Sequence, residues 1–326
     1  MSPTPAVSVI MSAYNAEAFI GRAIASLQAQ TFGDWELIVI DDCSSDDTQG
    51  VTEALAAQDA RIRYLRADTN RGCAIARNAG LGEARGTWIT ILDADDQYTP
   101  DRLEFLYNEA QARRADIVAD NQIYFDEALG RVVREKAYTL GGIDCLPLTA
   151  ERITDNDAPP RLFSCGLLKP FIRRAFMTQS GVTIYDPAFR HAEDFGLLFT
   201  LLFKGARGFM FEKTGYIYTI PFGVKAPKEK QTSRTDYGKT GWLAIIEANG
   251  ILMEMVRREA HGDVKLLAAL QRRKRRCSRE IVWREFRQHL REGHILQALK
   301  MARHANLLTY AWDAGRNKFR ASGLMM

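Results

Sequence analysis

Short apolar runs alternate with segments of helical periodicity through the first hundred residues. The apolar runs are predicted to be strands at 7–12, 35–40, 62–65 and 88–92. The segments between them are predicted to be helices at 16–30, 46–58 and 73–84. Each predicted strand is nearly all apolar rather than alternating, which is typical of a parallel sheet covered by helices on both faces. The pattern therefore predicts an α/β fold.

The rest of the chain is less regular. After Pro100 the pattern predicts a helix to about 113 and strands at 116–119, 121–125 and 131–135. An irregular stretch is expected at 137–162. Two more helices are predicted, an apolar-basic one (LKPFIRRAFM) within 163–180 and one at 194–204. Residues 221–240 are rich in Pro, Gly, Lys and Thr and are predicted to be a mobile loop. From about 241 the sequence is predicted to be helical. We therefore expect a domain over 1–220, a basic loop over 221–240 and a helical extension over 241–326.

Polar residues follow three of the predicted strands. Tyr14 and Asn15 follow the first, Asp41 and Asp42 end the second, and the stretch LDADD at 92–96 follows the fourth. In open α/β sheets ligands bind beyond the carboxyl ends of the strands, so these side chains are expected to line one crevice.

The LDADD stretch places three carboxylates, Asp93, Asp95 and Asp96, within four residues. Oxygen ligands of this kind suit Mg²⁺ or Mn²⁺, which also bind substrate phosphates. The alternative is a solvated acidic turn.

A second acidic pair, Glu193 and Asp194, stands at the start of the helix predicted at 194–204. One interpretation is that Asp194 caps the helix. The other is that a carboxylate here acts as a general base that removes a proton from an attacking hydroxyl. The nearby His191 is not included among the catalytic candidates.

Several common site motifs are absent from the sequence. It contains no Gly-x-Gly-x-x-Gly after a strand, no P-loop motif and no Gly-x-Ser-x-Gly, which argues against dinucleotide binding, P-loop ATPases and serine hydrolases. The five cysteines are scattered and odd in number, so neither a disulfide framework nor a zinc site is expected from them. No signal peptide and no apolar run of about 18 residues is found, and we expect a cytoplasmic protein.

Five blocks of sequence resemble, in order and spacing, family 2 of the inverting glycosyltransferases: VSVIMSAYN at 7–15, DDCSSDDT at 41–48, NRGCAIARNAG at 70–80, LDADD at 92–96 and the Glu193–Asp194 pair with the helix after it. The resemblance covers about residues 5–220. It implies the GT-A fold, with a Rossmann-like nucleotide-binding half, an acceptor half around a mixed sheet, and here a C-terminal helical extension. It also implies a UDP-sugar donor, a saccharide or lipid-linked acceptor and Mn²⁺ or Mg²⁺. The stretch YIYTIPFG at 216–223 is most similar to glucosyltransferases of succinoglycan-type exopolysaccharide pathways.

The resemblance also implies roles for single residues. For the nucleotide it implies contacts from Ala13, Tyr14, Asp41 or Asp42, Arg71, Asn78, Asp93 and Asp95, with Asp41 preferred as the acceptor of the uracil N–H. Asp95 is implied to bind the metal, with Asp96 as the alternative ligand. Asp194 is implied to be the catalytic base, with Glu193 touching the acceptor or the donor sugar.

Two basic segments extend this interpretation. Gln231 and Arg234 match part of a Q-x-x-R-W element of processive family members, but Thr235 stands in place of Trp, which puts polymer synthesis in doubt. This loop is expected either to bring Arg234 or Lys225 to the diphosphate or to be a solvated basic loop.

The second segment is the C-terminal region. Residues 253–326 contain 17 Lys and Arg and 7 Asp and Glu, a net charge of +10 in a chain whose total is +4. The run at 272–276 (RRKRR) is expected to lie between helices, either as a solvated charge run or as part of a peripheral contact with the anionic inner face of the plasma membrane. Nucleic-acid binding is not expected, because no aromatic residues alternate with the basic ones.

Two other functions compete with a glycosyltransferase. A nucleotidyltransferase would need a Gly-rich, basic loop after the first strand, where the sequence has SAYNAE. A catalytically silent protein that binds a sugar nucleotide or a lipid is the alternative outside enzymes, and a turnover assay would separate it from a glycosyltransferase.

Overall fold

The computed structural model describes residues 4–156, 168–182, 185–186, 188–189, 192–220, 238–259 and 263–305. The chain divides into two compact units. The first comprises Met1–Thr149, Leu168–Pro187 and Thr200–Lys230, and the second comprises Ala150–Leu167, Ala188–Phe199 and Gln231–Met326. The predicted division at 220 and 241 stays a prediction.

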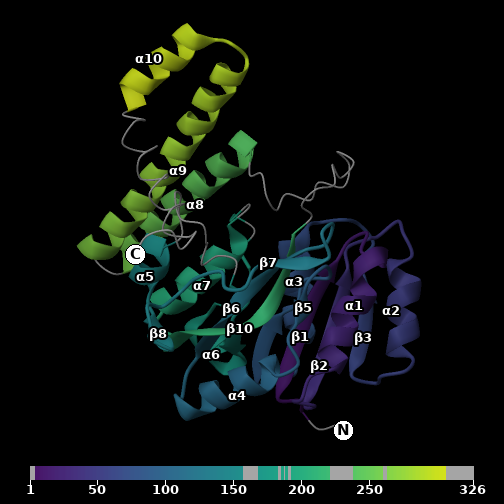
Figure 1. Ribbon diagram of the computed structural model, residues 1–326. Helices are drawn as coiled ribbons and strands as arrows, with labels where there is room; N and C mark the ends of the chain where they lie inside the picture. The colour runs from purple at the N-terminus through teal and green to yellow at the C-terminus, as the bar shows by residue number, and fades with distance from the viewer. Residues whose placement is uncertain are drawn as a thin grey trace. The chain divides into compact units, whose positions relative to one another are not determined.

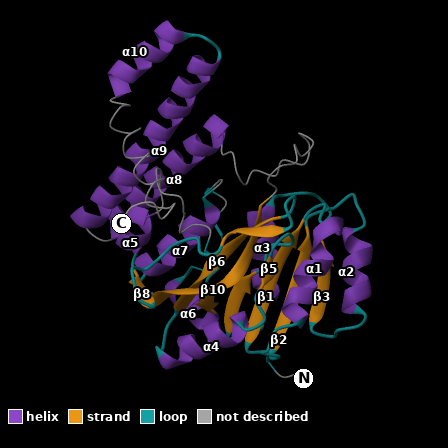
Figure 2. Cartoon of the chain, viewed as in Figure 1, coloured by secondary structure: helices purple, strands orange, loops and turns teal. Residues whose placement is uncertain are grey.

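The first unit begins with the predicted alternation of strands and helices (Figures 1 and 2). The elements are β1 (Val7–Ala13), α1 (Glu17–Gln28), β2 (Trp35–Asp41), α2 (Thr48–Ala56), β3 (Ile62–Arg66), α3 (Cys73–Glu83) and β4 (Trp88–Ile91). The four strands are parallel, in the order β3-β2-β1-β4. This confirms the predicted parallel sheet.

The two faces of β1 pack against different helices because side chains alternate along a strand. Val9 and Met11 are completely buried in the cluster that also contains Ile24 of α1. Ile10 points to the other face, where a Cβ on Gly80 of α3 would lie 2.5 Å from its Cγ2 atom. The glycine therefore lets α3 lie close enough to the sheet to cover it.

The second part of the sheet is mixed. It contains β5 (Gln97–Tyr98), β6 (Ile117–Asp126), β7 (Arg131–Arg134), β8 (Cys145–Leu148), β9 (Phe171–Arg173) and β10 (Gly208–Ile220). Strand β10 is parallel to β6 and antiparallel to β5 and β8, and β9 is antiparallel to both β4 and β6. Helices α4 (Arg102–Ala112) and α6 (Arg174–Ser180) belong to the same unit, whereas α7 (Glu193–Phe203) is divided, with its residues up to Phe199 in the second unit. The expected mixed sheet is confirmed.

The structure corrects three predictions here and adds one strand that was not predicted. The two strands predicted at 116–119 and 121–125 are one strand, β6, because the buried Asp120 between them pairs with Arg102 of α4 at 2.8 Å. The irregular stretch at 137–162 contains β8 and helix α5 (Ala150–Asn156). Part of the apolar-basic helix is β9, which fills the gap between β4 and β6. Strand β10, the longest of the described strands, was not predicted.

The second unit is helical. It contains α5, α8 (Gly238–Glu259), α9 (Val264–Arg291) and α10 (Ile295–Ala305), with α9 packed against the other three (Figure 1). The basic run at 272–276 was expected to lie between helices, and this prediction is wrong. The run lies within the continuous helix α9. No described helix is long and apolar enough to cross a membrane.

Candidate active site

The carboxyl ends of β1, β2 and β4 lie side by side, as the parallel pairing requires. Ala13 stands opposite Asp41 in the register of β1 and β2, and the Asp42 N–H donates to the Ala13 carbonyl at 2.8 Å. The Leu92 N–H donates to the Ile10 carbonyl, so β4 ends on the other side of β1. Three of the predicted polar clusters therefore share one edge of the sheet.

Asp93, the first acid after β4, is held between two buried cations. Its Oδ1 atom accepts a hydrogen bond from Arg77 Nη2 at 2.7 Å, and its Oδ2 atom lies 3.1 Å from Lys169 Nζ. All three side chains are at most 5% exposed. In the structure these partners fix the Asp93 carboxylate within its loop, and a direct nucleotide contact from Asp93 stays a prediction.

Asp96 is also held by protein groups. Its Oδ2 atom accepts from the Tyr216 hydroxyl at 2.7 Å and its Oδ1 atom accepts from the Thr219 N–H at 2.8 Å, both on β10. The Tyr216 oxygen in turn accepts from the Asp93 N–H at 3.2 Å. One phenol thus ties both ends of the acidic loop to the strand beside it.

Asp95 differs from its two neighbours because its side chain is partly exposed. Its main-chain carbonyl accepts from Arg22 Nη2 at 3.3 Å, and Arg22 is also paired with Glu127. The main-chain carbonyl is therefore anchored. Of the two candidate metal ligands, Asp95 is the more exposed residue, because Asp96 is completely buried.

The two acids after β2 organise neighbouring loops. Asp41 is completely buried, and it accepts from the Ser44 N–H, the Tyr64 hydroxyl and Arg66. Burial, followed by the hydrogen bond to Asp41, raises the pKa of Tyr64 to about 12.

Asp42 accepts from the main-chain N–H groups of Arg71 and Gly72 at 2.9 and 2.7 Å, which fixes the start of α3. A carboxylate offers about four acceptor positions, so both Asp41 and Asp42 retain capacity for a further donor. The preference for Asp41 stays a prediction.

The other predicted nucleotide contacts have varied surroundings. Tyr14, immediately after β1, is 47% exposed, and the Arg71 side chain is also exposed. Asn78 is different: its side-chain amide donates to the Tyr185 carbonyl at 2.8 Å and accepts from the Tyr185 N–H at 2.6 Å. In the structure it therefore holds a loop, and a direct nucleotide contact from Asn78 stays a prediction.

The second acidic pair occupies the first turn of α7, where both Glu193 and Asp194 are partly buried. Negative charge is favourable at a helix N-terminus, so this position supports the capping interpretation as well as the catalytic one. The candidates Lys225 and Arg234 lie outside the described residues, together with Gln231 and Thr235.

Sequence reasoning missed the residues that hold the acids. Arg77, Lys169 and Tyr216 contact Asp93 or Asp96 and are nearly inaccessible to water. One signal was available for Arg77, which lies on the face of α3 that also buries Ala76 and Gly80. A cation on the buried face of a helix needs an anionic partner.

Three of the five basic residues at 272–276 face protein groups in the second unit. Arg272 donates two hydrogen bonds to Asp155, and Arg276 donates to the Asp155 carbonyl. Arg273 is 2% exposed, donates to Asn249 at 3.0 Å and stacks on the Phe195 ring. The expectation of a solvated charge run is therefore wrong for Arg273, whereas Arg272 and Arg276 are paired but partly exposed. The membrane contact of this run stays a prediction.

Comparison with known proteins agrees with the sequence resemblance. Residues 8–178 match the family described as Glycosyl transferase family 2. The chain is 37% identical over 223 residues to the succinoglycan biosynthesis protein ExoO of Rhizobium meliloti, an alignment that covers 67% of this chain and 62% of that protein. It is 34% identical over 154 residues to an Escherichia coli protein, UDP-Glc:alpha-D-GlcNAc-diphosphoundecaprenol beta-1,3-glucosyltransferase WfgD, covering 45% of this chain and 60% of the other. The chain thus spans less than two thirds of these relatives.

The fold is also similar to solved structures. The crystal structure of Staphylococcus aureus TarS residues 1–349 in complex with UDP-GlcNAc superimposes with a TM-score of 0.63 at 20% identity, covering 82% of this chain and 72% of that one. The complex of the same protein with UDP gives a TM-score of 0.60 at 21% identity, covering 82% and 71%. The similarity confirms the GT-A-like α/β fold.

Proposed function

The chain belongs to glycosyl transferase family 2, and we propose that it moves a hexose, glucose, from a UDP-sugar to a saccharide acceptor with inversion at the anomeric carbon. The acceptor is lipid-linked and the product is a surface polysaccharide or exopolysaccharide. The names of ExoO and WfgD support this assignment. The structural observation that carries it is the acidic loop after β4, in which Asp93 and Asp96 are buried and held by protein groups and Asp95 is partly exposed.

The donor nucleotide is proposed to bind at the shared ends of β1, β2 and β4. The exposed Tyr14 ring can stack on the base beside Ala13, and Asp41 or Asp42 can accept from the uracil N–H. The exposed Arg71 guanidinium can pair with the diphosphate, because a guanidinium matches phosphate oxygens with two parallel donors. Lys225 and Arg234 are proposed as further diphosphate contacts.

The residues fit a divalent cation with oxygen ligands. Asp95 would supply one carboxylate, and the donor diphosphate and water would supply the remaining oxygen ligands, as is usual for Mg²⁺ and Mn²⁺. When bound, such a cation offsets the negative charge that develops on the leaving diphosphate. Arg22 holds the Asp95 backbone and the Tyr216 hydroxyl fixes the loop, which supports the proposal that the loop is ordered before the donor arrives.

Asp194 is proposed as the general base. Its carboxylate takes the proton of the acceptor hydroxyl as the hydroxyl oxygen attacks the anomeric carbon, and the bond from that carbon to the UDP oxygen breaks. Glu193 is proposed to bind a sugar hydroxyl. Attack from the face opposite the leaving group gives the inverted configuration, which an NMR spectrum of the product would report.

The test is a UDP-release assay with a panel of UDP-sugars, with Mn²⁺, Mg²⁺ or a chelator, and with acceptor oligosaccharides. We expect Asp194→Asn to lower kcat by about 10²–10⁴-fold, the usual contribution of a general base, while UDP affinity changes little. Unchanged turnover in this variant would remove Asp194 from the mechanism. UDP binding with no turnover on any donor would favour the silent binding protein instead.

Asp95→Asn and Asp96→Asn distinguish the two candidate ligands. We expect Asp95→Asn to weaken Mn²⁺-dependent UDP binding with little change in the melting temperature. Asp96→Asn should lower the melting temperature, because it weakens buried hydrogen bonds to a charged acceptor. The opposite pattern would make Asp96 the main ligand.

We also propose that the enzyme works at an anionic membrane surface, through α10 rather than through the run at 272–276. Ile295, Leu296 and Leu299 of α10 are 59–77% exposed in a region of net positive charge. Exposed apolar residues on a basic helix favour interfacial binding. Flotation with phosphatidylglycerol vesicles should recover the protein, and Leu296→Ser with Leu299→Ser should reduce the recovery. Equal recovery of the variant would exclude α10.

A further inference from the structure

The turn between α9 and α10 brings two histidines together. Helix α9 ends at Arg291, and Gly293 has φ +79°. The Gly293 N–H donates to the Leu290 carbonyl, and the His294 N–H donates to the His289 carbonyl at 2.8 Å. These are the two hydrogen bonds of a Schellman motif, in which the side chains corresponding to 289 and 294 are usually apolar and touch each other. Here both are histidine.

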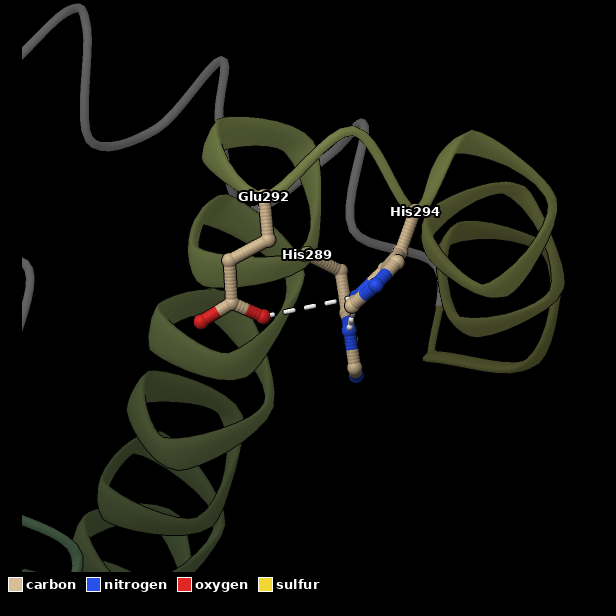
Figure 3. Close-up of side chains that lie close together, drawn as sticks. All are labelled: His289, Glu292 and His294. Atoms are coloured by element: carbon tan, nitrogen blue, oxygen red, sulfur yellow. Dashed lines mark hydrogen bonds and ion pairs between the residues drawn. The ribbon is translucent and has the colours of Figure 1, made fainter.

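The side chains of this turn place three ligand atoms close together (Figure 3). The Nδ1 atoms of His289 and His294 are 3.5 Å apart, and His294 Nδ1 is 3.4 Å from Glu292 Oε2. Among the residues that the structure describes, this is the group of His, Cys, Asp and Glu side chains whose ligand atoms all lie within 4.8 Å of one another.

A neighbouring residue orients the carboxylate. Gln288 Nε2 donates to Glu292 Oε1 at 2.8 Å, which leaves Oε2 as the oxygen nearest His294. In metal sites, the atom of a ligand that does not bind the metal is regularly hydrogen-bonded to another protein group, and this bond orients the ligand.

The distances match a tetrahedral zinc site. Zinc binds imidazole nitrogen and carboxylate oxygen at about 2.0–2.2 Å, so two ligand atoms of a tetrahedron lie about 3.3–3.6 Å apart. Two of the three distances already have this value. Two imidazoles also disfavour Mg²⁺ and Ca²⁺, which prefer oxygen ligands.

We propose that this turn binds Zn²⁺ through His289, Glu292 and His294, with water in the fourth position. The bound ion joins the end of α9 to the start of α10 and restricts the angle between the two helices. The site lies in the helical unit and is independent of the cation proposed for the nucleotide.

The test is titration of the untagged full-length chain with ZnCl₂ in a calorimeter. A second titration with Co²⁺ follows the visible absorption of the bound ion, whose strength distinguishes tetrahedral from octahedral coordination. We expect one site per chain. Removing a group that only orients a ligand costs about 10–100-fold in metal affinity, so we expect Gln288→Ala to cost about tenfold and His289→Ala or His294→Ala to cost more than that.

His261→Ala is the matched control, because it removes another of the five histidines and leaves the three ligands in place. It should bind zinc as the parent chain does. Circular dichroism of each variant checks that the helices are intact. The proposal is refuted if the parent chain gives neither binding heat nor a cobalt band. It is also refuted if the His289→Ala, His294→Ala double variant binds zinc as tightly as the parent.

Discussion

Replacing Tyr216 with phenylalanine would remove one oxygen from the centre of the acidic loop and leave the ring in place. That oxygen donates to Asp96 Oδ2 at 2.7 Å and accepts from the Asp93 N–H at 3.2 Å, and the side chain is 1% exposed. The substitution would therefore weaken the bonding of a buried carboxylate and of a main-chain N–H together.

The expected cost follows from the charge of the acceptor. A hydrogen bond to a charged group contributes about 1.5–3 kcal/mol, and one between neutral groups about 1 kcal/mol. We expect Tyr216→Phe to lower the free energy of unfolding by about 2–4 kcal/mol. Tyr98→Phe is the matched control, because the Tyr98 hydroxyl is equally buried but donates to a neutral acceptor, the Ile91 carbonyl, at 2.8 Å. Its expected cost is about 1 kcal/mol.

Urea denaturation measures both costs, and titration with UDP in the presence of Mn²⁺ measures the effect on the site. Tyr216→Phe should weaken Mn²⁺-dependent UDP binding because the loop that presents Asp95 loses its tie to β10. Tyr98→Phe should leave that affinity unchanged. Equal losses of stability in the two variants, with equal UDP affinities, would refute the view that the phenol of Tyr216 organises the loop.

Three further predictions concern other parts of the structure. Gly215→Ala should lower the free energy of unfolding by about 1–3 kcal/mol, because its Cβ would overlap the buried Arg102–Asp120 ion pair between α4 and β6. The control Gly82→Ala has open space around it and should be neutral or slightly stabilising in the same urea titration. Arg273→Ala should lower the melting temperature clearly, because Arg273 is buried. Arg275→Ala, on the exposed side of α9, should change the free energy of unfolding by less than about 0.5 kcal/mol. Equal effects would refute the view that Arg273 lies on the buried face of α9 and Arg275 on the exposed one. Burial raises the pKa of Tyr98 to about 12 from 10, so the unfolded chain loses this proton first. Tyr98 should therefore contribute a loss of stability on the order of 3 kcal/mol as pH rises from about 10 to 12, in addition to any loss from Tyr64. Tyr98→Phe should remove the Tyr98 contribution in urea titrations across this range.

The first half of the fold could be predicted from sequence because its strands are buried on both faces. Runs such as Trp35–Asp41 are wholly buried, and runs of that kind stand out against helical periodicity. The mixed half carries weaker signals. Strand β10 contains Glu212, Lys213 and Gly215, and it shifts register twice against β6, so its pattern is neither continuous nor alternating.

The candidate site could be predicted only for the residues next to strand ends. The carboxylates of LDADD were visible, but their partners come from α3, from the segment before β9 and from β10, at least 16 residues away in the chain. Nothing in the local sequence links Lys169 or Tyr216 to Asp93. Likewise, the sequence of the run at 272–276 is typical of a solvated segment. Only the packing of α9 shows that Arg273 contacts a polar partner, Asn249, and an aromatic one, Phe195.

The two buried cations beside Asp93 bear on the proposed order of ligand binding. Arg77 and Lys169 contribute two positive charges against the three carboxylates of the loop, which leaves one net negative charge among these five groups. On the proposed mechanism, the donor diphosphate would bring the rest of the negative charge that a dication needs. The donor and the cation would then bind as a preformed complex and leave together after sugar transfer.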